Sequence, residues 1–282
     1  MIFKRLAVML SLLLIVSLSF GKNVDNHPAK KLFIPHVFNS LTDTGYMDKT
    51  VDVASLPDTG STYESDIEIL PPAVRLDMPV PGDQGKQASC GAWAVVYGAG
   101  NYYVHLKTGK PYSDSENLSP AFIYNQLPKG SGGRVAFIDN LELFRAEGAC
   151  SLKSMPYHAN DYSARPDSTQ RLEAANYKIK GWERIDLHDL TLLKKAIFEK
   201  KPVIFFIATD DGFAKLAQPF MWKERHGKIG TSHSMVIAGY DDERNAFLVM
   251  NSWGPSWGDK GFLWIDYQFF LANAAPKGYI LI

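Results

Sequence analysis

The chain between residues 72 and 200 carries apolar side chains at helical intervals. From Cys90 to about His105 the apolar positions recur every three or four residues, which predicts a buried helix. Ser119 and Pro120 provide an N-cap hydroxyl followed by a first-turn proline, which is typical of a helix start. Two further helical patterns are expected, over residues 135–147 and from about 189 to 200.

The pattern changes after residue 200 to short apolar runs separated by turn residues, which is typical of strands. The expected strands are residues 203–207, 233–240, 246–250 and 261–265. A helical part followed by an antiparallel β part predicts an α+β fold with a helical N-terminal lobe, a β-sheet or barrel C-terminal lobe, and a cleft between them.

The N-terminus differs from both parts. Lys4 and Arg5 precede an apolar run from Leu6 to Phe20, and Gly21 offers a small residue for cleavage. Residues 1–21 therefore read as a signal peptide, which predicts an exported protein, secreted or periplasmic, with no membrane contact after cleavage. The alternative is a permanent anchor, although the run is short for a spanning helix.

Residues 22–67 are polar with a few apolar islands and several turn formers. This composition predicts an extension without a core of its own, such as a hairpin or an extended strand packed on the main domain. Pro71-Pro72 marks the entry to the globular part, and the main domain is expected over residues 68–282.

Composition narrows the classes of function. Hydrophobic residues make up 46% of the chain and charged residues 21%, which is ample for a core. The formal net charge of +0 gives no electrostatic footprint for nucleic acid or an anionic membrane. Two cysteines, Cys90 and Cys150, are too few for a structural zinc site. Neither a metal nor an organic cofactor is expected.

Cys90 stands where a glycine-containing loop turns into the first predicted helix. The free amides and partial positive charge of a helix N-terminus stabilise a thiolate, and the thiolate is the nucleophilic form of cysteine. Taken alone, the residue fits a buried structural cysteine better than a nucleophile.

His233 opens one predicted strand and Asn251 follows the next, so pairing of these strands would bring the two side chains together. A histidine there can take the thiol proton and later protonate a leaving amine. The asparagine amide can hold the imidazole in the useful tautomer. Trp253 is expected either to shield that hydrogen bond and contact substrate or simply to pack in the core.

Gln84 lies six residues before Cys90. Its amide is expected to donate, together with the backbone N–H of Cys90, to the oxyanion that develops on an attacked carbonyl. The alternative is an ordinary surface glutamine.

These three blocks resemble the signatures of papain-like cysteine peptidases. The matching segments are Gln84-Gly…Ser-Cys90-Gly-Ala-Trp, Ser-His233-Ser and Asn251-Ser-Trp-Gly-Pro-Ser-Trp-Gly. The resemblance spans about residues 68–280 and implies the two-lobed fold, the catalytic set Cys90, His233, Asn251 and Gln84, and substrate binding by the backbone of Gly132 and Gly133.

Two departures from the family pattern are informative. Gly91 follows the nucleophile where tryptophan is usual, and Gln87 replaces a cysteine three residues before it, so the customary disulfide of the helical lobe is missing. The chain therefore resembles a disulfide-poor bacterial branch. Cys150 is expected to be a buried thiol, and no Cys90–Cys150 bridge is predicted because it would block the nucleophile.

The predicted function is a secreted, monomeric cysteine peptidase that hydrolyses peptide bonds of protein or peptide substrates through a thioester acyl-enzyme. Residues 22–67 are expected to be a short inhibitory propeptide or, alternatively, a simple packed extension. Two other functions remain open, namely a catalytically silent binding protein on the same fold and an acyl-transferring relative such as a transpeptidase or amidase. Subsite preference and endopeptidase against exopeptidase action do not follow from the motifs.

Overall fold

The computed structural model describes residues 61–130, 133 and 135–282. The predicted signal peptide, most of the predicted extension and Gly132 lie outside the described residues. The part of the extension that is described runs along a sheet edge, where the backbone N–H of Tyr63 donates to the carbonyl of Arg184 at 2.8 Å and that of Arg184 to Ser61 at 2.9 Å. Tyr63 is buried. Residues 61–63 are thus a packed extended segment.

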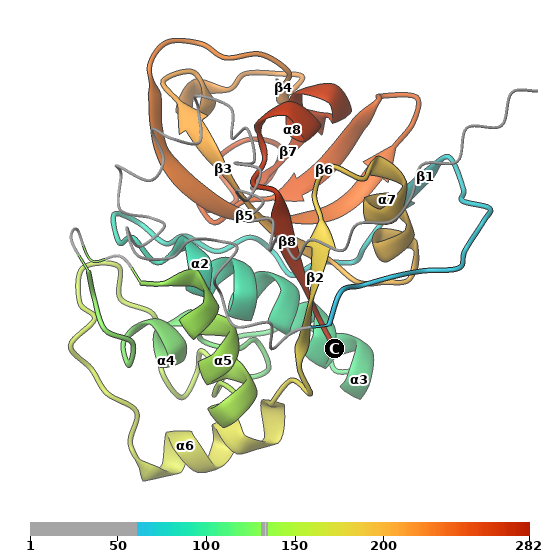
Figure 1. Ribbon diagram of the computed structural model, residues 1–282. Helices are drawn as coiled ribbons and strands as arrows, with labels where there is room; N and C mark the ends of the chain where they lie inside the picture. Colours follow the sequence, from blue (N-terminus) through green and yellow to red (C-terminus); the bar gives the residue numbers. More distant parts are fainter. Residues whose placement is uncertain (1–60, 131–132, 134) are drawn as a thin grey trace, which may run out of the picture. The chain divides into compact units, whose positions relative to one another are not determined.

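Helices dominate the part of the chain up to residue 177 (Figure 1). They are α2 (Cys90–Ala92), η1 (Trp93–Gly100), α3 (Asn101–Thr108), α4 (Pro120–Tyr124), α5 (Phe137–Glu147), α6 (Ser168–Ala174) and η3 (Ala175–Tyr177). The first three follow one another without a break and form a central helix whose middle section, η1, is π-helical. The prediction for residues 90–105 is therefore confirmed, although the π-helical section was not foreseen.

A mixed sheet forms the other lobe. Its strands are β1 (Ala73–Arg75), β2 (Trp182–Asp186), β3 (Val203–Asp210), β4 (Met221–Trp222), β5 (Ile229–Asp241), β6 (Ala246–Met250), β7 (Phe262–Asp266) and β8 (Lys277–Leu281). Their order is β2-β8-β3-β5-β6-β7-β4, with β1 paired to β5. The pairs between these strands are antiparallel, as predicted, except that β4, a strand of two residues that was not predicted, pairs with β7 in parallel.

Three short helices accompany these strands. They are α7 (Leu190–Phe198), η4 (Phe213–Lys215) and α8 (Tyr267–Asn273). Helix α7 begins at Asp189, whose side chain accepts the backbone N–H of Leu192, and α5 ends at Gly148 as predicted. Gly148 has a positive φ of 79°, and a Cβ there would lie 2.0 Å from the carbonyl oxygen of Ala174, so only glycine fits this turn.

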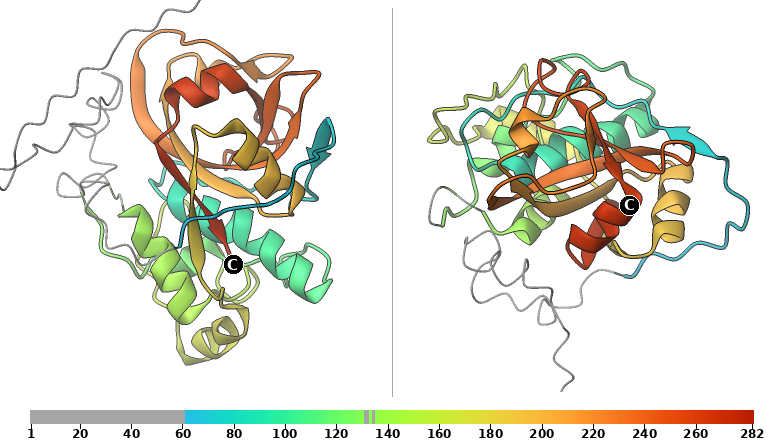
Figure 2. Two further views of the ribbon diagram at one scale, coloured as in Figure 1. Left: turned by 45° about the vertical axis from the view of Figure 1, so that its right-hand side comes forward. Right: turned by 90° about the horizontal axis from the view of Figure 1, so that it is seen from above.

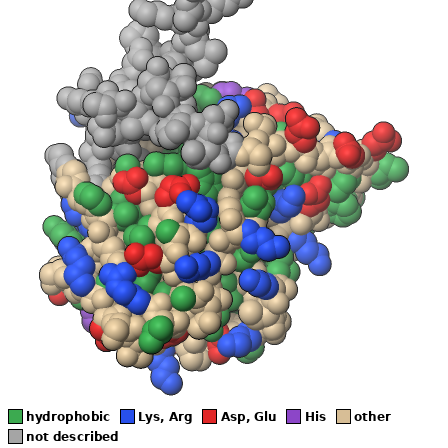
Figure 3. Space-filling view, turned by 60° about the horizontal axis from the view of Figure 1, so that its bottom comes forward, with side chains coloured by type: hydrophobic (Ala, Val, Ile, Leu, Met, Phe, Trp, Pro, Cys, Tyr) green, Lys and Arg blue, Asp and Glu red, His purple; other side chains and the backbone are tan. Residues whose placement is uncertain are grey.

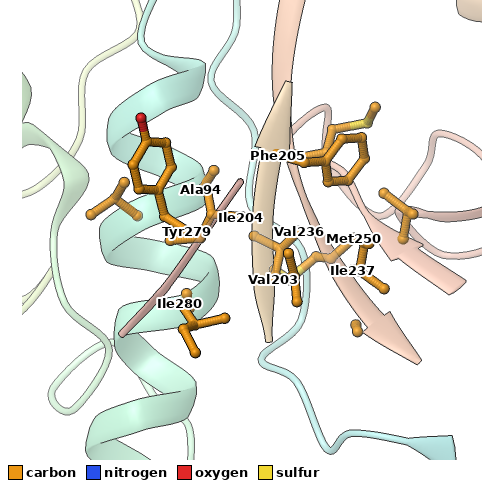
Figure 4. Close-up of a cluster of buried hydrophobic side chains, with 14 of the residues drawn as sticks. Ala94, Val203, Ile204, Phe205, Val236, Ile237, Met250, Tyr279 and Ile280 are labelled. Atoms are coloured by element: carbon orange, nitrogen blue, oxygen red, sulfur yellow. The ribbon is translucent and has the colours of Figure 1, made fainter. Parts of the chain in front are cut away.

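The core lies where the central helix packs on the sheet. Figure 4 shows Ala94 of the central helix close to Ile204 of β3 and to Tyr279 of β8. Gly98 lets the helix approach closely, because a Cβ there would lie 2.8 Å from the Val236 side chain. In Figures 1 and 2, helices α4 to α6 and most of the strands lie on opposite sides of the central helix. The N-terminus of this helix is therefore set against the sheet.

The surface carries charges of both signs. In the view of Figure 3, basic and acidic side chains are interspersed among polar and apolar ones. Within the described ranges, no helix is both long and apolar enough to cross a bilayer.

Candidate active site

Cys90 is the first residue of the central helix and is buried. Its side chain lines a pocket of about 330 Å³ together with His233 and Gln84. The sulfur and the imidazole thus come from opposite lobes and meet in one cavity, as the sequence predicts. Cys90 therefore stands at a helix N-terminus, where the partial positive charge of the helix is favourable for an anion.

His233 and Asn251 come together because β5 and β6 pair. The register aligns Val236 with Met250, so His233 sits on the neighbouring stretch of β5 as the chain leaves β6 at Asn251. The two side chains lie 2.7 Å apart, from Nε2 of the imidazole to Oδ1 of the amide, and both are buried. The predicted pairing of these two residues is present in the structure.

The partners of the Asn251 side chain fix the imidazole tautomer. Its Oδ1 also accepts the backbone N–H of Ser252 at 2.8 Å. An amide oxygen only accepts hydrogen bonds, so Nε2 of His233 must carry the hydrogen that it shares with Oδ1. The other ring nitrogen, Nδ1, is then left to exchange a proton with the sulfur.

Aromatic rings cover this hydrogen bond. Trp253 lies with its ring centroid 5.0 Å from that of His233, at an interplanar angle of 33°. Phe213 of η4 packs on both, with its centroid 6.2 Å from His233 and 5.1 Å from Trp253. A hydrogen bond is stronger where water is excluded, so these rings stabilise the oriented imidazole. Trp253 also lines the pocket, and its contact with substrate stays a prediction.

Gln84 is held at the pocket wall by hydrogen bonds of its backbone and side chain, and its carbonyl accepts the hydroxyl of Tyr157 at 2.9 Å. Its backbone N–H donates to the carbonyl of Ser252 at 2.9 Å. Its Oε1 accepts from the Ser252 hydroxyl at 2.7 Å, and its Nε2 donates to the carbonyl of Gln87 at 2.7 Å. An amide nitrogen has two hydrogens, so one remains for an oxyanion.

Of the two glycines predicted to bind substrate, the structure describes only Gly133. Gly132 lies outside the described residues. Gly133 has a positive φ of 77°, and its carbonyl accepts the hydroxyl of Tyr124 at 2.6 Å. It is not among the residues lining the pocket around Cys90.

Cys150 is remote from this chemistry. No disulfide joins the two cysteines. Burial, with a smaller contribution from Glu173, raises the pKa of the Cys150 thiol to about 12. A thiol with so high a pKa is a poor nucleophile, and the predicted buried structural thiol fits this position.

Several residues that support the site were missed by sequence reasoning. Ser252 and Phe213 are examples, because their contacts depend on tertiary structure. Ser252 follows Asn251 directly, so its place in the motif was an available signal. The position of Phe213 is fixed by the buried carboxylate of Asp210, which accepts the backbone N–H of Phe213 at 2.9 Å. No local sequence pattern predicts that contact.

Metal binding finds no support in the described part of the chain, where no group of three or more His, Cys, Asp and Glu side chains is placed to hold an ion.

A helix-borne cysteine that shares a pocket with a strand-borne histidine–asparagine pair defines a site of the thiol-hydrolase class. A family model described as papain family cysteine protease matches residues 82–272, well over half of the chain. The chain therefore belongs to the papain family of cysteine proteases, which confirms the resemblance drawn from the motifs.

The curated relatives are longer than this chain. A senescence-specific cysteine protease of rice (Oryza sativa subsp. indica) is 30% identical over 236 residues, which cover 79% of this chain and 64% of the relative. Mouse cathepsin K is 26% identical over 184 residues, which cover 64% of this chain and 54% of cathepsin K. The chain thus spans less than two thirds of the length of either relative.

Solved structures share the fold. Xylellain, a cysteine protease from Xylella fastidiosa, superposes with a TM-score of 0.69 at 22% identity, covering 82% of this chain and 92% of xylellain. Digestive procathepsin L 3 of Tenebrio molitor gives a TM-score of 0.63 at 18% identity, covering 87% and 79%. The α+β two-lobed fold predicted from the sequence is confirmed.

Proposed function

We propose that the chain is a cysteine peptidase that hydrolyses peptide bonds through a covalent thioester. The observation that carries the proposal is the 2.7 Å contact between His233 Nε2 and Asn251 Oδ1, made beside a pocket that Cys90 also lines. This contact directs Nδ1 of the same ring to proton exchange with the sulfur.

Acylation then runs as follows. The Cys90 thiol gives its proton to His233 Nδ1, and the thiolate forms a C–S bond to the substrate carbonyl while the carbonyl electron pair moves to oxygen. The Cys90 backbone N–H and Gln84 Nε2 donate to that oxyanion. Collapse breaks the C–N bond, the imidazolium protonates the departing amine, and the acyl thioester remains.

Deacylation repeats these steps with water. His233 takes a proton from a water molecule, whose oxygen attacks the thioester carbonyl. The C–S bond breaks, the carboxylic acid leaves, and the proton on His233 returns the sulfur to its starting state.

The test is covalent labelling with an epoxysuccinyl thiol-peptidase inhibitor. We expect one inhibitor per chain, attached to Cys90, and a large loss of labelling in Cys90→Ala and in His233→Ala. Cys150→Ala is the matched control and should label like the native protein. Labelling that survives in Cys90→Ala, or an unlabelled native protein that also cleaves no peptide, contradicts the proposal.

We further propose that residues 1–21 direct export and that residues 22–67 form a short inhibitory segment. Two of the structures with this fold are proforms, the procathepsin of Tenebrio and the Amb a 11 protease of ragweed pollen. Residues 61–63 pair with β2 on the catalytic domain, which would tether a preceding segment to it. Incubating the purified precursor and sequencing its new N-terminus tests this, and an intact precursor with full activity contradicts an inhibitory segment.

Acyl transfer uses the same sulfur, so the proportion of hydrolysis and transfer is measured by product analysis with an added amine. We expect the free acid to dominate. An amide product dominating at millimolar amine would assign the site to transfer instead.

A further inference from the structure

The pocket at Cys90 lies between the loop that precedes this residue and the β lobe. Its wall is built from the loop that precedes Cys90, the facing ends of β3 and β5, and Trp253. The lining residues are Gln84, Gly85, Lys86, Gln87, Ala88, Cys90, Thr209, Thr231, Ser232, His233 and Trp253. Gly133, on the helical lobe, does not line it. The pocket therefore belongs to the imidazole side of the sulfur.

The chemistry of the proposed function assigns a half of the substrate to this side. His233 must hand its proton to the amine as the C–N bond breaks, so the amine and the residues attached to it lie within reach of the imidazole. The acyl half stays on the sulfur and extends the other way. The pocket thus receives the leaving half of the substrate.

One charge dominates this pocket. Among the described residues that line the pocket, Lys86 alone carries a permanent charge, while Thr209, Thr231 and Ser232 contribute hydroxyls. Thr209 donates to the carbonyl of Thr231 at 3.1 Å, which holds that wall together. None of these described lining residues is a carboxylate, so a negative group that enters the pocket is attracted by Lys86.

The backbone holds Lys86 firmly in this position. Gln84 and Gln87, on either side of it, are buried. Gln84 Nε2 donates to the Gln87 carbonyl at 2.7 Å, and Gln87 Nε2 donates to the His158 carbonyl at 2.7 Å. Lys86 itself is exposed between these anchors. The backbone at Lys86 is therefore anchored beside the pocket, and its side chain lines the pocket while staying exposed.

The nearest acidic residue in the sequence is already engaged. Asp83 accepts the backbone N–H of Gly85 at 2.8 Å and does not line the pocket. Within the described residues, no ion pair of Asp83 with Lys86 is formed.

We propose that Lys86 makes this enzyme select substrates with an aspartate or glutamate in the first two positions after the scissile bond. The inference rests on the proposed peptidase function and names the substrate class of the same site. Because the ammonium is exposed, its effect on kcat/KM is moderate, about two- to tenfold between a glutamate and a lysine at the same position.

The first experiment is the digestion of a peptide library of mixed sequence by the mature enzyme, with mass spectrometry of the products. We expect Asp and Glu to be enriched, and Lys and Arg depleted, within two residues after the cut. In Lys86→Glu this preference should reverse, whereas Lys153→Glu, an equal charge change at an exposed lysine away from the pocket, should keep the native preference.

The second experiment measures kcat/KM on matched quenched peptides that differ only by Glu, Gln or Lys at the selected position. The ratio of kcat/KM for the Glu peptide to that for the Lys peptide should be largest at low ionic strength, because the Debye length is about 30 Å at 0.01 M. The ratio should fall at 0.15 M, where the Debye length is about 8 Å. Lys86→Gln should turn over all three peptides at similar rates.

The outcomes separate the two proposals. Normal cleavage with equal rates for Glu and Lys peptides, or a preference unchanged in Lys86→Glu, overturns the charge selection and leaves the peptidase standing. Failure to cleave any peptide, together with no labelling of Cys90, overturns the peptidase and the inference with it.

Discussion

Asn251 makes the most consequential side-chain contacts of the site. Its Oδ1 serves two donors, His233 Nε2 and the Ser252 backbone N–H, while its Nδ2 is buried without a hydrogen-bond partner. A buried amide nitrogen without a partner costs free energy. The oxygen of Asn251 therefore accounts for both hydrogen bonds of its side chain. This is expected of a residue that orients the imidazole and not of one that only packs in the core.

Asn251→Ala removes this acceptor and leaves two buried donors unsatisfied. Losing these hydrogen bonds costs about 1–3 kcal/mol of free energy. If the transition state is destabilised by that amount, kcat/KM falls by about 5- to 150-fold. Asn251→Asp keeps an acceptor oxygen and should lose less. Steady-state kinetics on one peptide checks both, and equal rates for the native protein and Asn251→Ala would refute the orienting role.

Gln84→Ala should lower kcat by about 10²–10³, because it removes one donor to the oxyanion. Alkylation of Cys90 by iodoacetamide forms no oxyanion, so its rate should change little. The pair of measurements distinguishes oxyanion stabilisation from general damage. Loss of both rates together would mean that Gln84 acts only by holding Ser252.

At this scale the sequence revealed the reacting groups but not their surroundings. Cys90, His233 and Asn251 stand in local motifs whose spacing is visible in one dimension. Phe213 packs on His233 only because the chain between β3 and β5 folds back over the imidazole. Contacts of that kind depend on the tertiary structure, so no periodic pattern in the sequence predicts them.

Among the elements, the central helix relies on two glycines that its propensity would penalise. A Cβ at Gly98 would lie 2.8 Å from Val236, and one at Gly100 would lie 2.9 Å from Phe144. These glycines occur in the π-helical section, where the helix is pressed between β5 and α5. The close packing sets the position of the helix end that carries Cys90.

Gly100→Ala should therefore destabilise the protein by overpacking, by about 1–3 kcal/mol. Gly230→Ala is the matched control, because its Cβ would find only ordinary contacts, the nearest at 3.7 Å. Thermal unfolding of both variants tests this. A melting temperature of Gly100→Ala at or above that of Gly230→Ala would show that the helix can shift to make room.

Element prediction succeeded for β6 and α7 and failed for α6 and β8. β6 was predicted with its observed bounds, and α7 within two residues. Helix α6 was missed although Asp167 and Gln170 form a capping box that the sequence displays. Strand β8 was missed because its partners, β2 and β3, lie far from it along the chain.

At the scale of the whole molecule, stability at low pH depends on carboxylates held by hydrogen bonds. Glu173 is an example. Burial alone would raise the pKa of this carboxyl, but hydrogen bonds from Ser154 and Ser151 outweigh it and lower the pKa below the usual 4.5. A depressed pKa in the folded state contributes stability above the unfolded value, and this contribution is lost as pH falls through the folded value.

Glu173→Gln should therefore narrow the difference in melting temperature between pH 7 and pH 4, because its amide does not titrate. Glu243→Gln is the control, since that side chain is exposed. Differential scanning calorimetry at the two pH values provides the measurement. An unchanged difference in Glu173→Gln would assign the acid sensitivity to other carboxylates.

The segment of residues 82–84 joins the lobes beside the pocket. Gly254 donates its backbone N–H to the carbonyl of Gly82 at 3.0 Å, and Gln84 donates to Ser252 at 2.9 Å. Separating the two lobes at this edge would break the same hydrogen bonds that hold Gln84, the proposed oxyanion donor, in position. These hydrogen bonds therefore resist separation of the two lobes at this edge.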